Sequence, residues 1–239
     1  MTSIFGTIIA DNLTGDSFNN TIFGLAGNDN LSGFAGDDTI NGNQQSDTLY
    51  GDDGNDVIFG GQDDDYIYGG FDFIGGNDLL FGNLGNDFMY GQEGNDSVFG
   101  GQGDDIISGD SGNDLVSGDL GNDALFGIDI LALNPGSGEI DTLTGGPGSD
   151  SFFIGDSVTN YYTGAGNGDY ALITDFNQQE LDVIVVHTND SYSLENLTLP
   201  DAGTGTGIFQ TTAGQKELIG FVEGIDASVL NFSLDFVRL

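Results

Sequence analysis

The sequence predicts an all-β solenoid, in which very short parallel strands coil around one narrow core, followed by a smaller β-rich cap. A nine-residue pattern, G-x-x-G-x-D-x-U-x with U an apolar residue, recurs at a fixed step between Gly6 and Phe153. Glycine is unusually abundant, with 42 residues in 239. After Phe153 the pattern disappears, and runs of β-forming residues follow. A repeat of this kind buries one apolar position per unit when its copies stack.

The repeat divides the chain into fifteen units, of which thirteen have nine residues and two carry insertions. Gly51–Phe59, GDDGNDVIF, is a representative unit. The first position is Gly in all fifteen units, the fourth is Gly in ten, and the eighth is apolar in all. The sixth position is Asp in every unit except the second, which has Asn20. These sixth-position residues are Asp11, Asp29, Asp38, Asp47, Asp56, Asp65, Asp78, Asp87, Asp96, Asp105, Asp114, Asp123, Asp141 and Asp150.

Each unit has a direct mechanical interpretation. Glycine permits positive φ and close backbone approach, so G-x-x-G-x-D predicts a tight turn. The following x-U-x predicts a short strand whose middle side chain points inward. Two units then make one coil, coils stack at about 4.8 Å, and the whole array spans roughly 35 Å. Aspartates of every second unit should lie above one another, in two rows. The insertions within Gly69–Phe81 and Gly127–Thr144 should loop out without ending the stack.

The net charge of the chain limits the classes of partner that it can bind. The formal charge is −37, and the segment from Gly6 to Phe153 has 27 Asp and Glu but no Lys or Arg. Nucleic acid is excluded as a partner, because phosphate requires cations. The remaining candidates to interact with the carboxylates are metal cations, a basic protein or water. Stacked carboxylates repel, so we expect a hard cation between them. Ca²⁺ accepts about six to eight oxygen ligands, carboxylates and backbone carbonyls included, whereas Mg²⁺ demands a smaller octahedral shell. The chain has no Cys, so no disulfide or thiolate site can form.

The units resemble the nonapeptide repeats of the RTX (repeats-in-toxin) family, GGxGxDxUx. The resemblance implies a parallel β-roll with Ca²⁺ between successive turns, in a chain that folds in the calcium-rich cell exterior after type I secretion. It also implies that the fourteen sixth-position aspartates, together with turn carbonyls, are the calcium ligands, in two rows. Asn20, Gln45, Asp63 and Glu139 depart from the family pattern, so we expect weaker sites beside them. The alternative is a metal-free, glycine-rich solenoid.

The C-terminal segment predicts a second domain, residues 154–239, after a repeat domain of residues 1–153. Strands are expected at residues 170–176, 181–187, 208–212 and 217–222. The stretches ITDF (173–176) and ELIGFVEGID (217–226) resemble the C-terminal segment of RTX proteins, which caps the roll and carries an uncleaved secretion signal. An ordinary β cap without export information is the alternative. The N-terminus lacks the pattern of a conventional secretory leader, and no apolar run is long enough to span a membrane.

No catalytic pattern is visible, so we expect a protein that is not an enzyme. His187 is the only histidine, so a zinc protease with paired histidines is excluded, and we expect His187 to be structural. No G-x-S-x-G nucleophile motif occurs. Paired carboxylates such as Asp104–Asp105 are typical of glycosidases, but here they recur with the repeat and are interpreted as the periphery of calcium sites.

The ninth position is aromatic in nine units. Alternation should place Tyr50, Tyr68 and Tyr90 along one outer face, and the other face should carry Phe59, Phe81 and Phe99. Such ladders either mark an interface or stabilise the sheet by side-to-side stacking. The sequence leaves both interpretations open.

The sequence thus predicts a secreted, calcium-binding structural protein at the cell surface or outside the cell. We expect it to self-associate when loaded with calcium, into a matrix, a surface layer or a filament. One alternative is an accessory or targeting domain for a separate secreted enzyme. Another is a surface- or ice-binding adhesin module, which would require a regular outward Thr ladder. The third position, where one could run, holds Ser17, Ala26, Ala35, Gln44, Asp53 and Gln62 instead.

Overall fold

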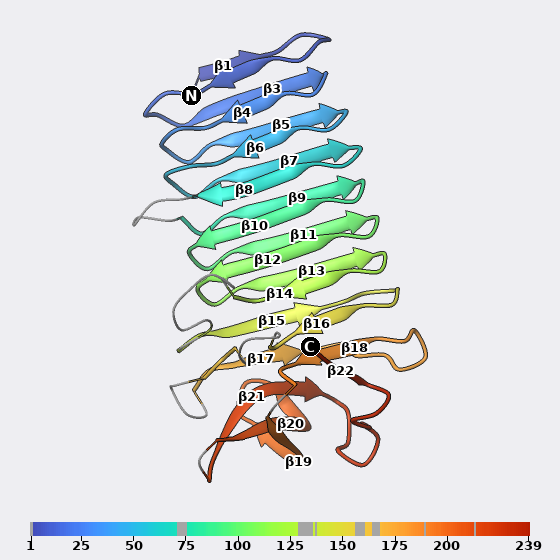
Figure 1. Ribbon diagram of the computed structural model, residues 1–239. Coiled ribbons are helices and arrows are strands. Elements are labelled where there is room, and N and C mark those ends of the chain that lie inside the picture. Colours follow the sequence, from blue (N-terminus) through green and yellow to red (C-terminus); the bar gives the residue numbers. More distant parts are fainter. Residues whose placement is uncertain are drawn as a thin grey trace.

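The computed structural model is a stack of flattened β-coils with a β-rich region at its C-terminal end (Figure 1). It describes residues 2–70, 76–128, 136, 138–155, 161–163, 168–188, 190–212 and 214–239. Within these ranges all the regular elements are β-strands, and there is no helix. The predicted all-β class is therefore confirmed.

Two sheets form the two faces of the stack, and successive strands of the repeats alternate between them. The 12-stranded sheet contains, in spatial order, β1 (Thr2–Phe5), β3 (Asn20–Ala26), β5 (Thr39–Gln44), β7 (Val57–Gln62), β9 (Leu79–Leu84), β11 (Ser97–Gln102), β13 (Leu115–Leu120), β15 (Ile140–Thr144), β17 (Tyr170–Ile173), β21 (Gln215–Glu223), β20 (Gly203–Thr212) and β19 (Ser191–Leu199). The 10-stranded sheet contains β2 (Asn12–Thr14), β4 (Asn30–Ser32), β6 (Thr48–Tyr50), β8 (Tyr66–Gly70), β10 (Phe88–Glu93), β12 (Ile106–Ser111), β14 (Ala124–Phe126), β16 (Ser151–Phe153), β18 (Val183–Val186) and β22 (Phe236–Arg238).

Strands two units apart pair in parallel, so two units make one coil as predicted. Ile40 lies opposite Ile58 in one sheet, and Leu49 lies opposite Ile67 in the other. The register survives both insertions, since Val116 still lies opposite Leu143 across the longer one. The predicted continuity of the stack is thus confirmed, while most of the inserted residues lie outside the described part of the chain.

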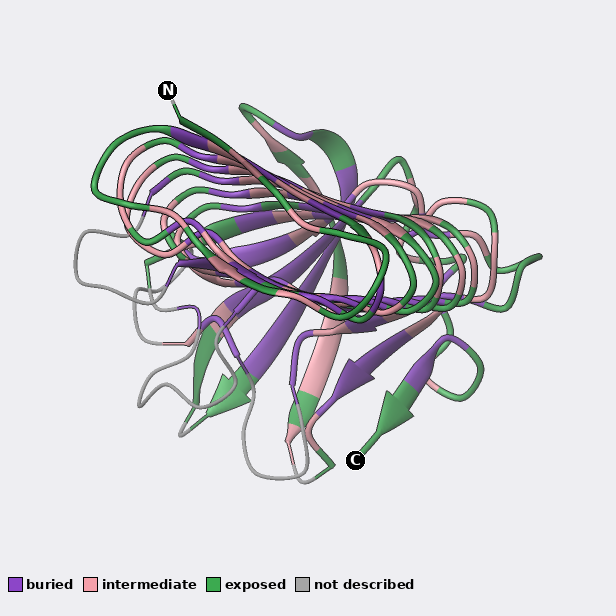
Figure 2. Ribbon diagram, turned by 90° about the horizontal axis from the view of Figure 1, so that it is seen from above, coloured by how far each residue is buried: buried purple, intermediate pink, exposed green. Residues whose placement is uncertain are grey.

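The core of the stack is a single file of eighth-position side chains between the two sheets. Seen along the stack, buried positions line the inner sides of the coils, and exposed ones gather at the turns (Figure 2). Fourteen of these side chains are fully buried: Ile22, Leu31, Ile40, Leu49, Ile58, Ile67, Leu80, Met89, Val98, Ile107, Val116, Leu125, Leu143 and Phe152. The prediction of one buried apolar residue per unit is confirmed.

Both sheets continue past Phe153, where the nine-residue step ends. β17 pairs with β15 and β18 with β16, in parallel, so the C-terminal region is built directly onto the last coil. The four strands expected there are present, although β20 begins five residues earlier than expected. β19 and β22 were not predicted. β19 contains five polar residues in nine and gains its stability by antiparallel pairing with β20, which local composition does not indicate.

The N-terminal coil leaves apolar side chains uncovered. Ile4 and Leu13 pack on the end of the core but stay only partly buried. Phe5, Ile8 and Ile9 are 62%, 81% and 68% exposed. Because β1 is the last strand of its sheet, this end presents an open strand edge together with an apolar surface.

The predicted aromatic ladders are present, and their rings stack on one another. Tyr68 lies between Tyr50 and Tyr90, at ring-centroid distances of 5.0 and 5.4 Å. On the other face Phe81 lies between Phe59 and Phe99, at 5.1 and 5.3 Å. The rings are nearly parallel and partly buried. Stacking within the sheet is therefore realised, and the rings remain partly exposed.

Candidate metal centre

The turn of each unit depends on the absence of a side chain at its glycines. Gly94, a fourth-position glycine, has φ of 139°. A Cβ atom there would overlap the carbonyl oxygen of Gly76, one coil earlier, so neighbouring turns stack too closely for any other residue. Where the sequence departs from glycine, Gln45 and Asp63 still take left-handed φ values of 70° and 71°. These two departures therefore keep a positive φ at the turn, although a smaller one than that of Gly94.

The first glycine of each unit leaves room for oxygen atoms. A Cβ atom on Gly42 would overlap Oδ2 of Asp47 and would lie 2.7 Å from the carbonyl oxygen of Gly60, in the next coil. The same arrangement recurs in neighbouring units, for example around Gly24, with Asp29 and the Gly42 carbonyl. A side-chain oxygen and a main-chain oxygen thus converge beside the first glycine of each unit from Gly6 to Gly100.

The sixth-position aspartates form two continuous rows. One carboxylate oxygen, Oδ1, accepts the backbone N–H of the aspartate one coil earlier, as from Asp29 to Asp47 and from Asp47 to Asp65, both at 2.8 Å. The first row contains Asp11, Asp29, Asp47, Asp65, Asp87, Asp105, Asp123 and Asp150. The second row contains Asn20, Asp38, Asp56, Asp78, Asp96, Asp114 and Asp141.

The other carboxylate oxygen, Oδ2, is buried and in most units has no protein donor. Among the described residues, twelve of these aspartates have such an Oδ2: Asp29, Asp38, Asp47, Asp56, Asp65, Asp78, Asp87, Asp96, Asp105, Asp114, Asp123 and Asp150. All twelve side chains are 3% exposed or less. A buried charged oxygen without a partner is strongly unfavourable, so each row requires positive charge at these atoms.

The electrostatics of the rows agree with this requirement. Burial raises the pKa of Asp56 to about 8, and repulsion from Asp78 and Asp38 adds to it. Burial raises the pKa of Asp114 to about 9, helped by repulsion from Asp141. The aspartates are thus poised to bind either a proton or a cation. No Lys or Arg is present in the repeats to take that place.

The donor set fits a hard divalent cation such as Ca²⁺. In the described parts of the chain, no three His, Asp or Glu side chains gather at one point to hold a metal. A cation would instead be held by carboxylate oxygens of the rows and completed by turn carbonyls such as that of Gly60. Ca²⁺ accepts this mixture in variable geometry, and its charge would offset the buried oxygens.

A second ladder, absent from the sequence-based prediction, runs along the outside of the turns. The fifth-position side chain of one coil accepts the N–H of the fifth residue in the next coil, as from Asn95 to Asn77 at 2.7 Å and from Asn113 to Asn95 at 2.8 Å. Asp104 belongs to this ladder and accepts from Asn122 at 2.8 Å. The recurrence of Asn or Asp at the fifth position was the available signal. Asp104 and Asp105 thus have different structural roles.

Two further aspartates join the site from outside the repeats. The first row continues to Asp182, whose Oδ1 accepts the N–H of Asp150 at 3.1 Å. Asp175, within the ITDF stretch, accepts the N–H groups of Gly145 and Gly146 at 2.9 and 2.7 Å. The C-terminal region therefore binds the last repeat turn with a carboxylate. Periodicity could not reveal these residues, because they follow the last unit at irregular spacing.

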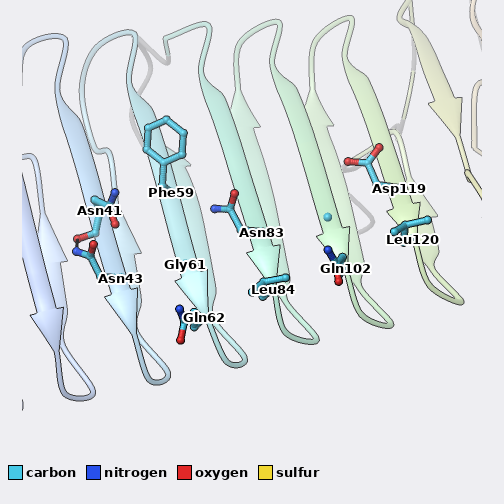
Figure 3. Close-up of a pocket in the computed structure, with 11 residues that line it drawn as sticks. Asn41, Asn43, Phe59, Gly61, Gln62, Asn83, Leu84, Gln102, Asp119 and Leu120 are labelled. Atoms are coloured by element: carbon cyan, nitrogen blue, oxygen red, sulfur yellow. Dashed lines mark hydrogen bonds between the residues drawn. The ribbon is translucent and has the colours of Figure 1, made fainter.

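A shallow groove of about 680 Å³ crosses strands β5 to β13 on the outer face of the 12-stranded sheet (Figure 3). Amide side chains such as Asn43, Asn83 and Gln102 line it, with Phe59 at one wall. Its one carboxylate, Asp119, accepts a hydrogen bond from the Ser117 hydroxyl at 2.8 Å. The groove is thus separate from the carboxylate rows, whose Oδ2 atoms lie inside the stack.

The solved structures that are similar to this chain include an epimerase subunit and a lipase. A subunit of the mannuronan C5-epimerase of Azotobacter vinelandii is 21% identical, with a TM-score of 0.33 over 82% of this chain and 80% of that one. The extracellular lipase LipA of Serratia marcescens is 14% identical, with a TM-score of 0.26 over 82% of this chain and 40% of that one. No curated protein matches the sequence. In the described ranges, no helix has the length and hydropathy needed to cross a membrane.

One family model matches the repeats directly. The model of the RTX calcium-binding nonapeptide repeat matches residues 14–49, 42–73, 75–107, 99–127 and 135–156, more than half of the chain. These matches cover the glycine turns and the aspartate rows described above. The chain therefore belongs to the family of proteins with RTX calcium-binding nonapeptide repeats.

Proposed function

We propose that this chain is a secreted, non-enzymatic structural protein whose β-roll folds around two rows of Ca²⁺ ions. The observation that carries the proposal is the set of twelve buried Oδ2 atoms without protein donors. Nine of the twelve lie beside a turn carbonyl of the next coil, and all twelve lie in a segment without basic residues. Calcium supplies the charge that these carboxylates lack, and so couples folding to the calcium concentration of the surroundings.

Folding that depends on calcium is compatible with export of the chain from the cell. A chain with so many uncompensated carboxylates stays expanded where Ca²⁺ is scarce and becomes compact where it is abundant. RTX repeats are typical of proteins that leave the cell by type I secretion, which supports a place at the cell surface or outside it. The segment from Asp175 onward, which caps the last turn, is the candidate for the export signal.

Assembly with copies of the same chain is the second half of the proposal. The N-terminal coil offers an open edge at β1 and exposed Ile8 and Ile9. The opposite end of the same sheet is also an edge strand, β19 (Figure 1). Contact between these different ends is head-to-tail and does not close, so it yields a filament. Bound Ca²⁺ lowers the net negative charge that would oppose the contact.

The aromatic ladders offer a lateral route instead. The rings of Tyr68 on one face and Phe59 on the other are partly exposed. Contact between ladders of neighbouring rolls would produce sheets or bundles rather than single filaments. The two routes therefore predict different particle shapes.

Light scattering and negative-stain imaging at millimolar Ca²⁺ test assembly. The paired substitutions Ile8→Ser and Ile9→Ser should abolish end-to-end filaments, whereas Phe59→Ser with Tyr68→Ser should abolish lateral association. Leu115→Ser, an exposed mid-stack position, is the matched control and should change neither. A wild-type protein that remains monomeric at every concentration would refute assembly but not calcium binding, which circular dichroism during calcium titration measures separately.

A further inference from the structure

We propose that the Tyr162 hydroxyl closes the second aspartate row, so that Asp141 Oδ2 binds a tyrosine proton in place of a cation. The inference rests on the proposed calcium binding of the rows. It changes one sequence-based expectation, that Asp141 is a calcium ligand like the other sixth-position aspartates.

The contact itself is specific and buried. The Tyr162 hydroxyl donates to Asp141 Oδ2 at 2.7 Å. Both residues are fully buried. In the interior of the stack, the corresponding Oδ2 atoms have no donor from the protein. Asp141 is therefore the exception in the C-terminal half of the repeats, since Asp114 before it and Asp150 after it both keep a free Oδ2.

The hydroxyl also lies beside the first glycine of the Asp141 unit, where the units from Gly6 to Gly100 have a turn carbonyl. A Cβ atom on Gly42 would meet Asp47 Oδ2 and the Gly60 carbonyl. On Gly127 the corresponding atom would meet Asp141 Oδ2 and the Tyr162 hydroxyl. A carbonyl can only accept, so it and Oδ2 together attract a cation. A phenol can donate, so its pair with Oδ2 is satisfied without one.

The row has no further aspartate beyond this point. In the sheet register, Asp141 lies opposite Ala171 of β17. The second row thus lacks the next carboxylate that every interior site has. The first row differs, since Asp150 is followed by Asp182.

The other row ends are closed in the same manner, by backbone donors. Oδ2 of Asp11 accepts the N–H of Thr7 at 2.5 Å. Asn20 Oδ1 accepts from Asp16 at 2.7 Å. Asp182 Oδ2 accepts the N–H of Asn177 at 2.7 Å. The Thr7 hydroxyl also donates to Asp11 Oδ2, at 2.9 Å. Each row is therefore open in its interior and closed by a protein donor at both ends, and Tyr162 closes its end with a side chain alone.

Native mass spectrometry of the full chain, titrated with Ca²⁺, counts the ions that the folded protein holds. Asp141→Asn should retain the wild-type number. Asp114→Asn, the preceding member of the same row with a free Oδ2, should lose at least one ion. Tyr162→Phe should lose none, because the phenol is not a calcium ligand. Circular dichroism identifies variants that are folded before they are counted.

The outcomes are separable. Loss of an ion in Asp141→Asn, or in a folded Tyr162→Phe, would overturn the inference, since Asp141 or Tyr162 would then be a ligand. If Asp141→Asn does not fold, the Tyr162→Phe count decides by itself. A wild-type protein that binds no Ca²⁺, or an Asp114→Asn variant with an unchanged count, would refute the proposed function of the rows and the inference with it.

Discussion

The repeat stack, Gly6–Phe153, and the C-terminal region, residues 154–239, share the same two sheets but are stabilised differently. In the stack, twelve of the fifteen units contain a buried apolar side chain and a buried carboxylate oxygen without a protein donor among the described residues. In the C-terminal region, rings such as Phe209 and Phe221 form a second apolar cluster. One carboxylate there, that of Glu195, forms an ion pair with Lys216.

The difference shows which region depends on an ion. A unit that buries one side chain per nine residues has little apolar surface with which to offset the entropy of ordering its turns. The buried carboxylates make that balance worse unless cations accompany them. The C-terminal region contains three strands of nine or ten residues, β19, β20 and β21, a second apolar cluster, and both basic residues of the chain, Lys216 and Arg238. We therefore expect calcium dependence to be concentrated in the stack.

The largest expected effect is that of calcium removal. Excess chelator should unfold the stack, with loss of the β-type circular dichroism signal and of amide protection in strands β3 to β16. Protection within the β19–β20–β21 hairpins should fall less, because no orphaned carboxylate lies there among the described residues. Hydrogen exchange with and without Ca²⁺ measures both regions in one experiment. An unchanged spectrum in excess chelator would contradict the stacked-ion model.

Next in size is the loss of one interior aspartate. Asp96→Ala removes a free Oδ2 and the acceptor for the N–H of Asp78. We expect a cost of about 2–3 kcal/mol, or roughly 5–10 °C in melting temperature at saturating Ca²⁺. Asp11→Ala, at a row end where Thr7 already donates, should cost clearly less. Equal melting losses in the two variants would argue against the row structure.

The stability of the calcium-free stack should depend on pH. Burial raises the pKa of Asp47 to about 7 and that of Asp56 to about 8, against an ordinary value of 3.8. Groups with a raised pKa favour the folded state while protonated, so this stability is lost as pH rises from about 4 to about 8. Asp226, whose pKa is lowered by hydrogen bonds from Ser228, contributes in the opposite direction.

Circular dichroism of metal-stripped protein tests this dependence. More β structure should remain at pH 5 than at pH 8. With Ca²⁺ present, the apparent calcium affinity should instead fall at pH 5, because protons compete for the same oxygens. Greater calcium-free structure at pH 8 would show that the aspartates are not buried as described.

The smallest expected effect concerns the aromatic ladders. Tyr68→Ser removes two ring contacts, with Tyr50 and Tyr90, each of which contributes about 0.5–1.5 kcal/mol. A melting-temperature loss of about 2–6 °C is expected. Phe18→Ser, at a largely exposed ring of the N-terminal coil, is the control and should change little. A larger loss for Phe18 would indicate that the N-terminal end is covered in solution.

Much of the stack follows from the sequence, because its period fixes both the strand and the turn. The core file from Ile22 to Phe152 and the two aspartate rows were predicted from spacing and are present in the structure. The contacts that close the ends of the rows were not predicted. Tyr162 reaches Asp141 from outside the repeats, and Asp182 follows Asp150 after 32 residues rather than 18. Such contacts depend on tertiary placement, which no local pattern encodes.

The coils of the stack are closely similar to one another, and this similarity affects how reliably the strands pair in the correct register. If one sheet slipped by a whole coil, apolar residues would still face apolar residues, and aspartates would still follow aspartates. The interior of the stack therefore cannot recognise its own register. Only its irregular places can. These are the insertions within Gly69–Phe81 and Gly127–Thr144, and the contacts of Tyr162 with Asp141 and of Asp182 with Asp150. A chain that has slipped by one coil loses these contacts and is therefore less stable. We infer that the C-terminal region helps to set the correct register of the coils.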